Sequence, residues 1–376
     1  MTGSSDAIII GGGIIGLATA YHLSRNGRKV IVLEKSSPGS GSTGRCIGGI
    51  RQQFSSEGAI RLMKESLRQF RRMNEDFGSP IDYHEGGYLF LAHSKEQLNG
   101  YKSILPLQRR LGLDVRLLSP DECLQIVPPL NPEGLMGGVF SPEDGQAYPF
   151  KVLDGYIRQI RSNGSMVRPY EEVCGIEVEN GAVRGVRTRS GDTYSSDIVV
   201  SASGPWAREV ARMAGIEIPV FPEEHEAFIT ARLPRLFDTM IVDYRVDGCY
   251  FYQRINGQVI GCYSPVPIKP GIHTESSLEF LVEMSSRTLR LVSQLKIARV
   301  IRHWGGCYPM TPDGSPIIDR TEIGGFYVAE GMCGHGFMFG PAIGKYLADL
   351  IVEGTYPFDW SEFRIDRDFS KKELLQ

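Results

Sequence analysis

The stretch Ala7-Ile8-Ile9-Ile10-Gly11-Gly12-Gly13-Ile14-Ile15-Gly16 decides the fold of this 376-residue chain. Its four apolar residues form a short strand, and a helical pattern follows the glycines as far as Asn26-Gly27. A second apolar strand, Lys29–Leu33, ends at Glu34, which lies 18 residues after Gly16. The order strand, glycine turn, helix, strand predicts a βαβ unit at the start of the chain.

The glycine spacing in this unit, Gly-x-Gly-x-x-Gly, is typical of a Rossmann dinucleotide site. Gly11 permits the tight turn, Gly13 lets the backbone approach a pyrophosphate, and Gly16 lets the helix pack on the sheet. The helix N-terminus, with Ile15 in its first turn, offers N–H groups to phosphates, and Glu34 can accept ribose hydroxyls. The alternative is a tight βα turn followed by a surface glutamate.

Composition excludes several other classes of protein. The chain has 41 Lys+Arg against 44 Asp+Glu, so its net charge is −3, which disfavours a nucleic-acid partner. Seven scattered cysteines form no CxxC pair, and neither a metal site nor a Ser-His-Asp, HExxH or Walker pattern is present. No signal peptide and no transmembrane run of 18 apolar residues is found, so we expect a cytoplasmic protein.

A second glycine-rich turn lies near the end of the chain. The strand Phe326–Ala329 runs into Gly331-Met332-Cys333-Gly334-His335-Gly336-Phe337, and a helix follows at Pro341–Val352. This arrangement again points a helix N-terminus at an electron-rich group. Reduced isoalloxazine carries negative charge near N1, which such a dipole stabilises, so the turn favours FAD over NAD.

The remaining pattern predicts an α/β fold in which two domains interleave. The FAD-binding domain comprises 1–80, 145–220 and 300–365, and is Rossmann-like. The α+β substrate domain comprises 81–144 and 221–299, and strand-like segments with short turns predict a mostly antiparallel sheet there. The charged tail, 366–376, is expected to be loosely held.

Three motifs in order resemble one known family. They are the first glycine motif, the stretch Gly39-Ser40-Gly41-Ser42-Thr43-x-Arg45-Cys46 running on to Ile50-Arg51-Gln52-Gln53-Phe54, and Gly334-His335-Gly336-Phe337. Together they resemble the D-amino-acid-oxidase superfamily of FAD-dependent oxidoreductases, over residues 7 to 353. In pattern the chain is most similar to the β subunits of heteromeric sarcosine oxidase and dye-linked L-proline dehydrogenase. Glycine oxidase and monomeric sarcosine oxidase are less similar.

The resemblance implies a set of cofactor-binding residues. Lys35 joins Glu34 at the adenosine ribose, and the other positions surround the pyrophosphate, the adenine and the flavin. The full set is Gly11, Gly13, Ile15, Gly16, Glu34, Lys35, Ser42, Thr43, Gly48, Gly49, Val173, Ser203, Gly204, Trp206, Gly331, Gly334, His335, Gly336, Phe337 and Met338.

The resemblance also places Arg51 where relatives hold the substrate carboxylate; pairing with a nearby acid is the alternative. Tyr250 and Tyr252 share one face of a strand that roofs the cavity in relatives, or they only pack there. His335 acts through its imidazole in proton handling or only through its backbone. His225 borders the cavity or is a solvated histidine among the acids Glu223-Glu224-x-Glu226.

Three departures from the family pattern refine the prediction. Gly306 stands where monomeric sarcosine oxidases attach flavin to a cysteine; Cys307 is one position late, which reverses its face on a strand, so we expect non-covalent FAD. Met338 replaces a lysine of the oxidases. The strand Gln258–Tyr263 lacks their oxygen-activating lysine, which Lys269 could replace only if the alignment slips. These departures favour a dehydrogenase.

The resulting hypothesis is FAD-dependent oxidation of the C–N bond of a small, secondary amino acid such as L-proline or sarcosine. Hydride passes to flavin N5, and the chain is the catalytic subunit of a hetero-oligomer with other redox subunits. The alternatives are an oxidase that produces H2O2, a flavoenzyme for a hydroxy acid, and an FAD-bearing subunit that is incomplete without its partners.

Overall fold

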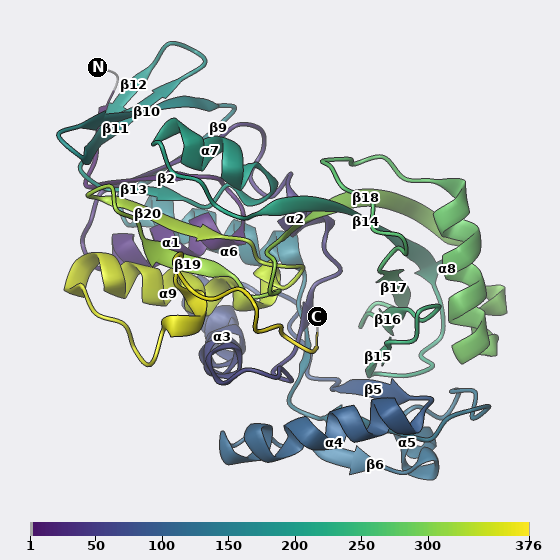
Figure 1. Cartoon of the computed structure of the whole chain (residues 1–376). Helices are drawn as coiled ribbons and strands as arrows, with labels where there is room; N and C mark the ends of the chain where they lie inside the picture. Colours follow the sequence, from purple (N-terminus) through teal and green to yellow (C-terminus); the bar gives the residue numbers. More distant parts are fainter. Residues whose placement is uncertain (1–2, 376) are drawn as a thin grey trace.

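The structure, a computed structural model, describes residues 3–375 and contains two large sheets (Figure 1). The first sheet has six strands, and all neighbours except β19 and β20 run parallel. Its order is β19 (Ile317–Arg320), β20 (Phe326–Glu330), β13 (Val199–Ser201), β2 (Ala7–Ile10), β3 (Val30–Glu34) and β9 (Met166–Pro169). The predicted βαβ unit forms its centre.

Both faces of this sheet are covered (Figure 1). One face carries α1 (Ile14–Arg25), α3 (Glu57–Phe77), α6 (Pro149–Ser162) and α9 (Gly336–Glu353). The other carries α7 (Ala207–Met213) and a four-stranded sheet of β1 (Gly3–Ser4), β12 (Thr193–Ser195), β11 (Ala182–Thr188) and β10 (Val173–Glu179). Helices α1 and α9 can approach closely because Gly344 has no side chain. A Cβ at this position would lie only 2.5 Å from Ala18.

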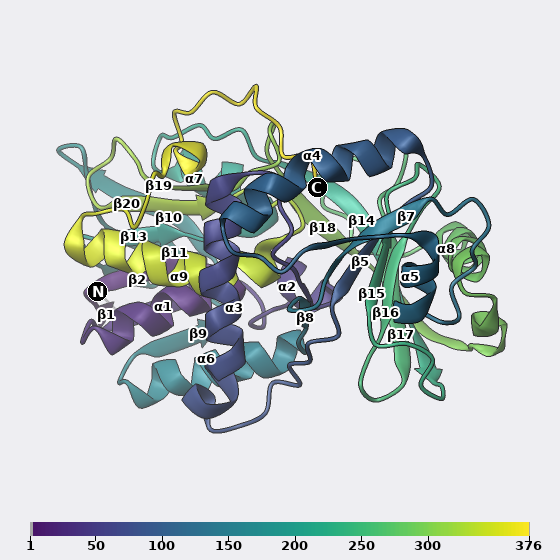
Figure 2. The same ribbon diagram turned by 90° about the horizontal axis from the view of Figure 1, so that it is seen from below.

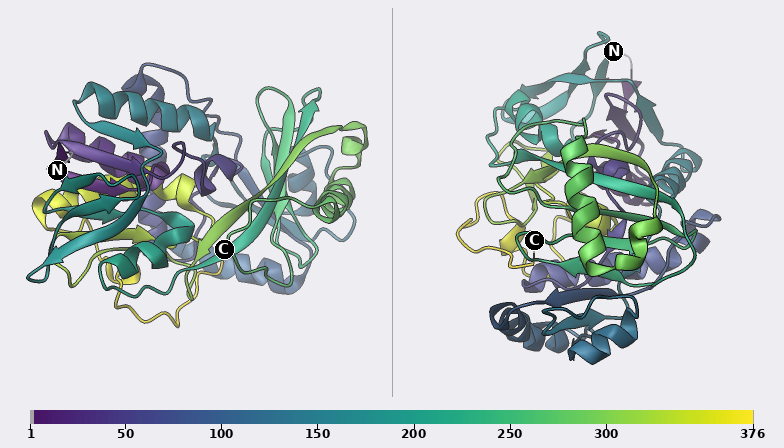
Figure 3. Two further views of the ribbon diagram at one scale, coloured as in Figure 1. Left: turned by 90° about the horizontal axis from the view of Figure 1, so that it is seen from above. Right: turned by 90° about the vertical axis from the view of Figure 1, so that its right-hand side faces the viewer.

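The second sheet has eight strands and lies beside the first lobe (Figures 2 and 3). Helices α5 (Pro120–Ile126) and α8 (Leu278–Leu291) cover its outer face, and the alternation of side chains turns Tyr88 and Phe90 toward the first lobe. Its order is β18 (Val300–Met310), β14 (Phe221–Arg232), β17 (Gln258–Tyr263), β16 (Tyr250–Gln253), β15 (Met240–Asp243), β5 (Tyr88–Ala92), β7 (Gly137–Ser141) and β6 (Arg116–Leu118).

One further helix, α4 (Lys95–Arg110), and several short elements complete the chain. The short elements are α2 (Ser42–Arg45), β4 (Gly49–Ile50), β8 (Gly145–Gln146), and the 3-10 turns Gly204–Trp206, Ser293–Ile297 and Ser361–Phe363. Within residues 3–375, no helix is both long enough and apolar enough to cross a membrane.

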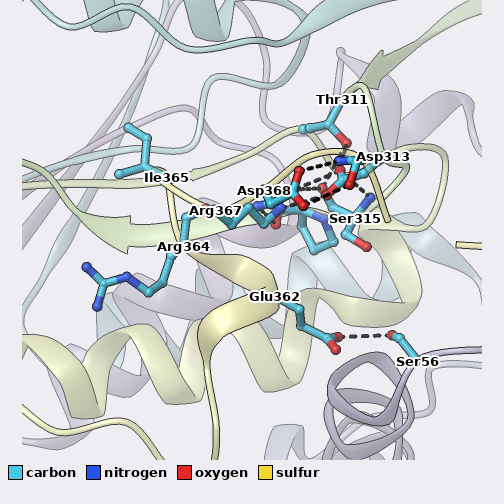
Figure 4. A network of polar contacts seen from close by, with 12 residues as sticks. Ser56, Thr311, Asp313, Ser315, Glu362, Arg364, Ile365, Arg367 and Asp368 are labelled. Carbon is cyan, nitrogen blue, oxygen red and sulfur yellow. Dashed lines mark hydrogen bonds and ion pairs between the residues drawn. The ribbon is translucent and has the colours of Figure 1, made fainter. Parts of the chain in front are cut away.

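Two expectations about chain organisation need correction. The segment 300–310, assigned to the FAD-binding part, is strand β18, and β14 pairs with it from Met310 to Val300. The tail was expected to be loose, but Arg367 makes a buried ion pair with Asp313, with Nε 2.7 Å from Oδ2 (Figure 4). Its charged residues suggested solvation, whereas this pair satisfies both charges inside the protein.

Candidate active site

A long cavity of about 360 Å³ runs along the carboxyl ends of the parallel strands. We call it the dinucleotide cavity. Most of the predicted cofactor-binding residues line it: Gly11, Gly13, Ile15, Glu34, Lys35, Ser42, Thr43, Val173, Ser203, Gly204, Trp206, Gly334, Gly336 and Phe337.

The first glycine motif leaves no room for side chains. Gly11 has a φ of +113°, and a Cβ there would lie 2.3 Å from the carbonyl O of Ala202. At Gly16 a Cβ would lie 2.0 Å from the carbonyl O of Gly11, so this glycine is needed for packing beneath the cavity rather than for lining it. The backbone of β2 and α1 thus stays open to a close ligand.

Glu34 and Thr43 hold the loops around this end of the cavity. The Glu34 carboxylate accepts hydrogen bonds from the N–H groups of Gly12 (2.7 Å) and Ser36 (2.8 Å). Thr43 Oγ1 accepts one from the N–H of Ile14 at 3.1 Å, which caps the start of α1 from α2. These bonds place an acidic group and a helix N-terminus in the same cavity, as the sequence predicts.

Lys35 and Trp206 form a pair at the wall of the dinucleotide cavity. The Lys35 Nζ lies 3.1 Å from the centroid of the Trp206 ring, a cation–π contact. Burial lowers the pKa of Lys35. Lys35 directly follows β3 and Trp206 lies in the turn after β13, so tertiary packing creates this contact.

Glu330, at the end of β20, is a site residue that the sequence analysis missed. Its Oε1 accepts hydrogen bonds of 2.7 Å from Ser201 Oγ, Ser203 N and Ser203 Oγ, and its Oε2 accepts one of 2.9 Å from Gly204 N. Burial raises its pKa to about 7. The available signal was its position, since Glu330 precedes the second glycine turn as an acid at a strand end.

A second cavity of about 450 Å³ adjoins the first. We call it the inner cavity. Both cavities are lined by Cys46, Tyr308, Gly334 and Phe337, so these residues mark the junction. Of the predicted residues, the inner cavity is lined by Gly49, Arg51, His225, Tyr250, His335 and Met338. It therefore brings together four of the five proposed catalytic residues.

Arg51 is a buried cation without a carboxylate partner in the described chain. Its side chain donates to the carbonyls of Gln53 and Leu375 and to Nε2 of His335, and its guanidinium lies 4.1 Å from the Phe54 ring centroid. The residue is only 3% exposed, and none of the residues 3–375 forms an ion pair with it. The charge of Arg51 also acts on the buried carboxyl of Asp144, so its role toward a substrate carboxylate stays a prediction beside the alternative of a nearby acid.

Tyr250, Tyr308 and His225 form a second group at the cavity wall. The hydroxyls of Tyr250 and Tyr308 lie 2.8 Å apart, and His225 stacks on Tyr308 with ring centroids 3.7 Å apart. Burial lowers the pKa of His225 to about 4. His225 is thus not a solvated histidine among acids, because strand alternation turns it to the cavity.

Several predicted residues lie outside the cavity expected for them. Tyr252 shares a face with Tyr250, but its hydroxyl donates to the carbonyl of Ile47 and it does not line the inner cavity. Neither cavity is lined by Gly16, Gly48 or Gly331. His335, Met338 and Gly49, predicted at the cofactor, line only the inner cavity. Lys269 lines a separate groove on the outside of the second lobe.

Residues without a motif complete the inner cavity. Those on or next to β5 and β15 are Tyr88, Met240, Val242, Tyr244 and Arg245. Arg245 is already paired, since its Nη2 lies 2.6 Å from Oδ2 of Asp243. Tyr88 lies on β5, Met240 and Val242 alternate on β15, and Tyr244 and Arg245 follow β15; only the pairing of the two strands identifies the face that meets the cavity.

A third cavity, of about 340 Å³, lies on the other side of Cys46. We call it the arginine cavity because it is lined by Arg45, Arg254 and Arg302 and by no Asp or Glu. None of the three forms an ion pair with the described residues. Cys46 lines all three cavities. No cluster of His, Cys, Asp and Glu within residues 3–375 is arranged to hold a metal.

Comparison with known proteins matches this geometry. The family described as FAD dependent oxidoreductase (DAO) matches residues 6–350. This chain belongs to that family. It is an FAD-dependent oxidoreductase, and the predicted family, α/β fold class and cofactor are confirmed.

Individual relatives cover almost the whole chain. Sarcosine oxidase subunit beta of Rhizobium meliloti is 32% identical over 96% of this chain and 88% of its own. L-proline dehydrogenase from P. horikoshii has a TM-score of 0.92 and 34% identity over 97% of both chains. Rat mitochondrial dimethylglycine dehydrogenase is 27% identical, and this chain covers 96% of its own length but only 45% of that longer protein.

Proposed function

We propose that this chain oxidises the C–N bond of a small, secondary amino acid such as L-proline or sarcosine. The observation that carries the proposal is Arg51, a buried guanidinium that forms no ion pair within residues 3–375 and faces a cavity beside the dinucleotide cavity. A buried cation without a counter-ion is costly, so the site fits a ligand that brings a carboxylate. The relatives named for sarcosine and proline agree with this choice.

The residues of the dinucleotide cavity fit FAD without a covalent bond. Glu34 binds the ribose, the N-terminus of α1 binds the pyrophosphate, and the glycines at 11 and 13 keep the backbone accessible. Cys307 lines the dinucleotide cavity, but its Sγ already donates to the carbonyl O of His273 at 3.4 Å, which supports a flavin that is not attached to it.

FAD supplies the hydride acceptor for this oxidation. Arg51 binds the substrate carboxylate, and the apolar walls around Met240 and Val242 favour the uncharged amine. Tyr250 and Tyr308 close the cavity at the junction and orient the substrate toward it. The chain contributes positioning and exclusion of water rather than a strong acid or base.

Two features favour a dehydrogenase that passes electrons to a partner. No lysine lines the inner cavity in the described part of the chain, although the family's oxidases are expected to carry one. The arginine cavity shares Cys46 with the dinucleotide cavity and offers positive charge to an anionic acceptor or subunit. The seven cysteines are all free, which fits a reducing compartment such as the cytoplasm.

An anaerobic titration of the purified chain tests the proposal. Visible spectra are recorded while L-proline, sarcosine, glycine and a hydroxy acid are added. Bleaching of the oxidised flavin band by proline or sarcosine is the expected result, with peroxide in air well below one equivalent per substrate oxidised. Bleaching only by the hydroxy acid, or by none of the panel, would contradict the amino-acid assignment. Stoichiometric peroxide would instead identify an oxidase.

A further inference from the structure

The last described residues, 367–375, run back across the first lobe as an ordered strap. Arg367 anchors the strap through Asp313 and also donates to the carbonyl of Ser315 at 2.7 Å (Figure 4). The N–H of Glu373 then donates to the carbonyl of Asp313 at 2.9 Å. The ion pair and these two hydrogen bonds thus hold the strap to the loop after β18, which contains Asp313 and Ser315.

Beyond this anchor the strap reaches the loop that carries Arg51. Glu373 Oε1 accepts hydrogen bonds from Ser55 N (2.8 Å) and Ser55 Oγ (2.6 Å). Ser55 Oγ in turn accepts one from the N–H of Leu374 at 2.9 Å. Leu375 is only 6% exposed, and its carbonyl accepts a hydrogen bond from Nη2 of Arg51.

We propose that Glu373 is a positioning residue for the carboxylate-binding Arg51. By tying the strap to Ser55, it places the Leu375 carbonyl against the guanidinium and fixes the loop 51–55 on which Arg51 lies. This inference rests on the proposed function, because it takes Arg51 to be the ligand of the substrate carboxylate. Glu373 itself does not line the inner cavity.

The physical reason is the flexibility of the arginine side chain. A free arginine loses rotamer entropy when it is immobilised, and ligand binding must supply that cost. Here the carbonyls of Gln53 and Leu375 and the ring of His335 already hold the guanidinium. Pre-organisation of this kind strengthens ligand binding without adding a contact to the ligand.

The test uses the FAD-loaded protein and pyrrole-2-carboxylate, a planar carboxylate that cannot be oxidised like proline. Its dissociation constant is measured from perturbation of the flavin spectrum in the wild type, Glu373→Ala, Glu373→Gln and Ser55→Ala. Gln keeps the oxygen that accepts from Ser55, whereas Ala removes it. Glu353→Ala, at an exposed glutamate near the end of α9, is the matched control.

We expect Glu373→Ala to weaken binding about 10-fold, with Glu373→Gln restoring most of it and Glu353→Ala having no effect. Ser55→Ala also weakens binding. The double variant of Ser55→Ala and Glu373→Ala loses less affinity than the product of the two single losses, because both substitutions remove the same hydrogen bond. FAD content and kcat at saturating substrate stay near wild type. A general loss of folding would lower both, so unchanged FAD content isolates the positioning effect.

Two results would overturn the inference, and they differ from each other. If Arg51→Met weakens binding but Glu373→Ala does not, the strap has no positioning role and the proposed function stands. If Arg51→Met binds pyrrole-2-carboxylate as tightly as the wild type, the carboxylate is not held by Arg51, and both proposals fail.

Discussion

Nη2 of Arg51 lies 2.9 Å from Nε2 of His335, at the wall of the inner cavity. A guanidinium can only donate, so Nε2 must accept, and the neutral ring carries its proton on Nδ1. Burial and the neighbouring Arg51 both lower the pKa of His335 well below its ordinary value. His335 therefore stays neutral, and its Nδ1–H has no partner among the described residues. The pair thus combines a buried cation with a neutral imidazole at the wall of the inner cavity.

Arg51→Met should raise KM for the amino acid about 100-fold, because loss of one partner of a buried charge pair costs on the order of 3 kcal/mol. FAD should remain bound, since Arg51 does not line the dinucleotide cavity. Steady-state kinetics and the flavin spectrum measure the two effects. Arg51→Lys keeps the positive charge but loses the planar pair of N–H donors, so its KM should lie between those of the wild type and Arg51→Met. An unchanged KM would remove Arg51 from this role.

Gly334→Ala should disrupt the junction of the two cavities. A Cβ there would lie 2.4 Å from Cε2 of Tyr308, and the backbone has a φ of +79°. Gly354→Ala is the matched control, because its φ is +74° but nothing lies within 4 Å of the added Cβ. Backbone strain of about 1 kcal/mol is common to both variants. We expect only Gly334→Ala to lose reduction of the flavin by the amino acid; equal behaviour of the two variants would refute the steric argument.

His225 should make the protein sensitive to acid. Its pKa is about 4 in the folded protein against an ordinary value of 6.5, so below pH 6.5 the unfolded chain binds the proton first. Stability from this group is therefore present above pH 6.5 and is lost as the pH falls toward 4. Between pH 7 and pH 5 the loss is about 2 kcal/mol.

The variant His225→Phe keeps the stacking on Tyr308 but cannot titrate. Urea unfolding at pH 7 and pH 5 should show a smaller loss in this variant than in the wild type. Exposed His273→Gln serves as the surface control. If His225→Phe and the wild type lose the same free energy of unfolding, burial of His225 does not control this pH dependence.

Glu34→Ala should weaken FAD binding roughly 30-fold, since hydrogen bonds to a charged group contribute about 2 kcal/mol. The substitution removes the acceptor for the N–H groups of Gly12 and Ser36 as well as for a ribose hydroxyl. Titration of the apoprotein with FAD measures the dissociation constant. Exposed Glu133→Ala should bind FAD as the wild type does. An equal affinity for Glu34→Ala would exclude Glu34 from the ribose site.

Local sequence was enough to predict the dinucleotide cavity. The turn between β2 and α1 and the acid at the end of β3 lie within 34 residues of the start, so chain connectivity alone keeps them together. The φ of +113° at Gly11 is a local property of this turn, whereas the steric clash that a Cβ there would make is with Ala202, which only the tertiary structure brings close. Glu330 was missed although it occupies the matching place at the end of β20, because no spacing rule links it to Ser201 and Gly204.

Only the tertiary structure decided the inner cavity and the strap. Arg51, His225, Tyr250 and His335 come from four elements, and strand pairing determines which of their faces meet. Tyr252 shows the limit of strand alternation as a predictor. It shares the face of Tyr250, but its hydroxyl donates to the carbonyl of Ile47 and it does not line the inner cavity. The charges of the tail predict that it is solvated, yet Arg367 forms an ion pair with Asp313, 54 residues earlier in the chain. Alternation and charge specify which residues can be buried together, whereas long-range packing selects the partners that they meet.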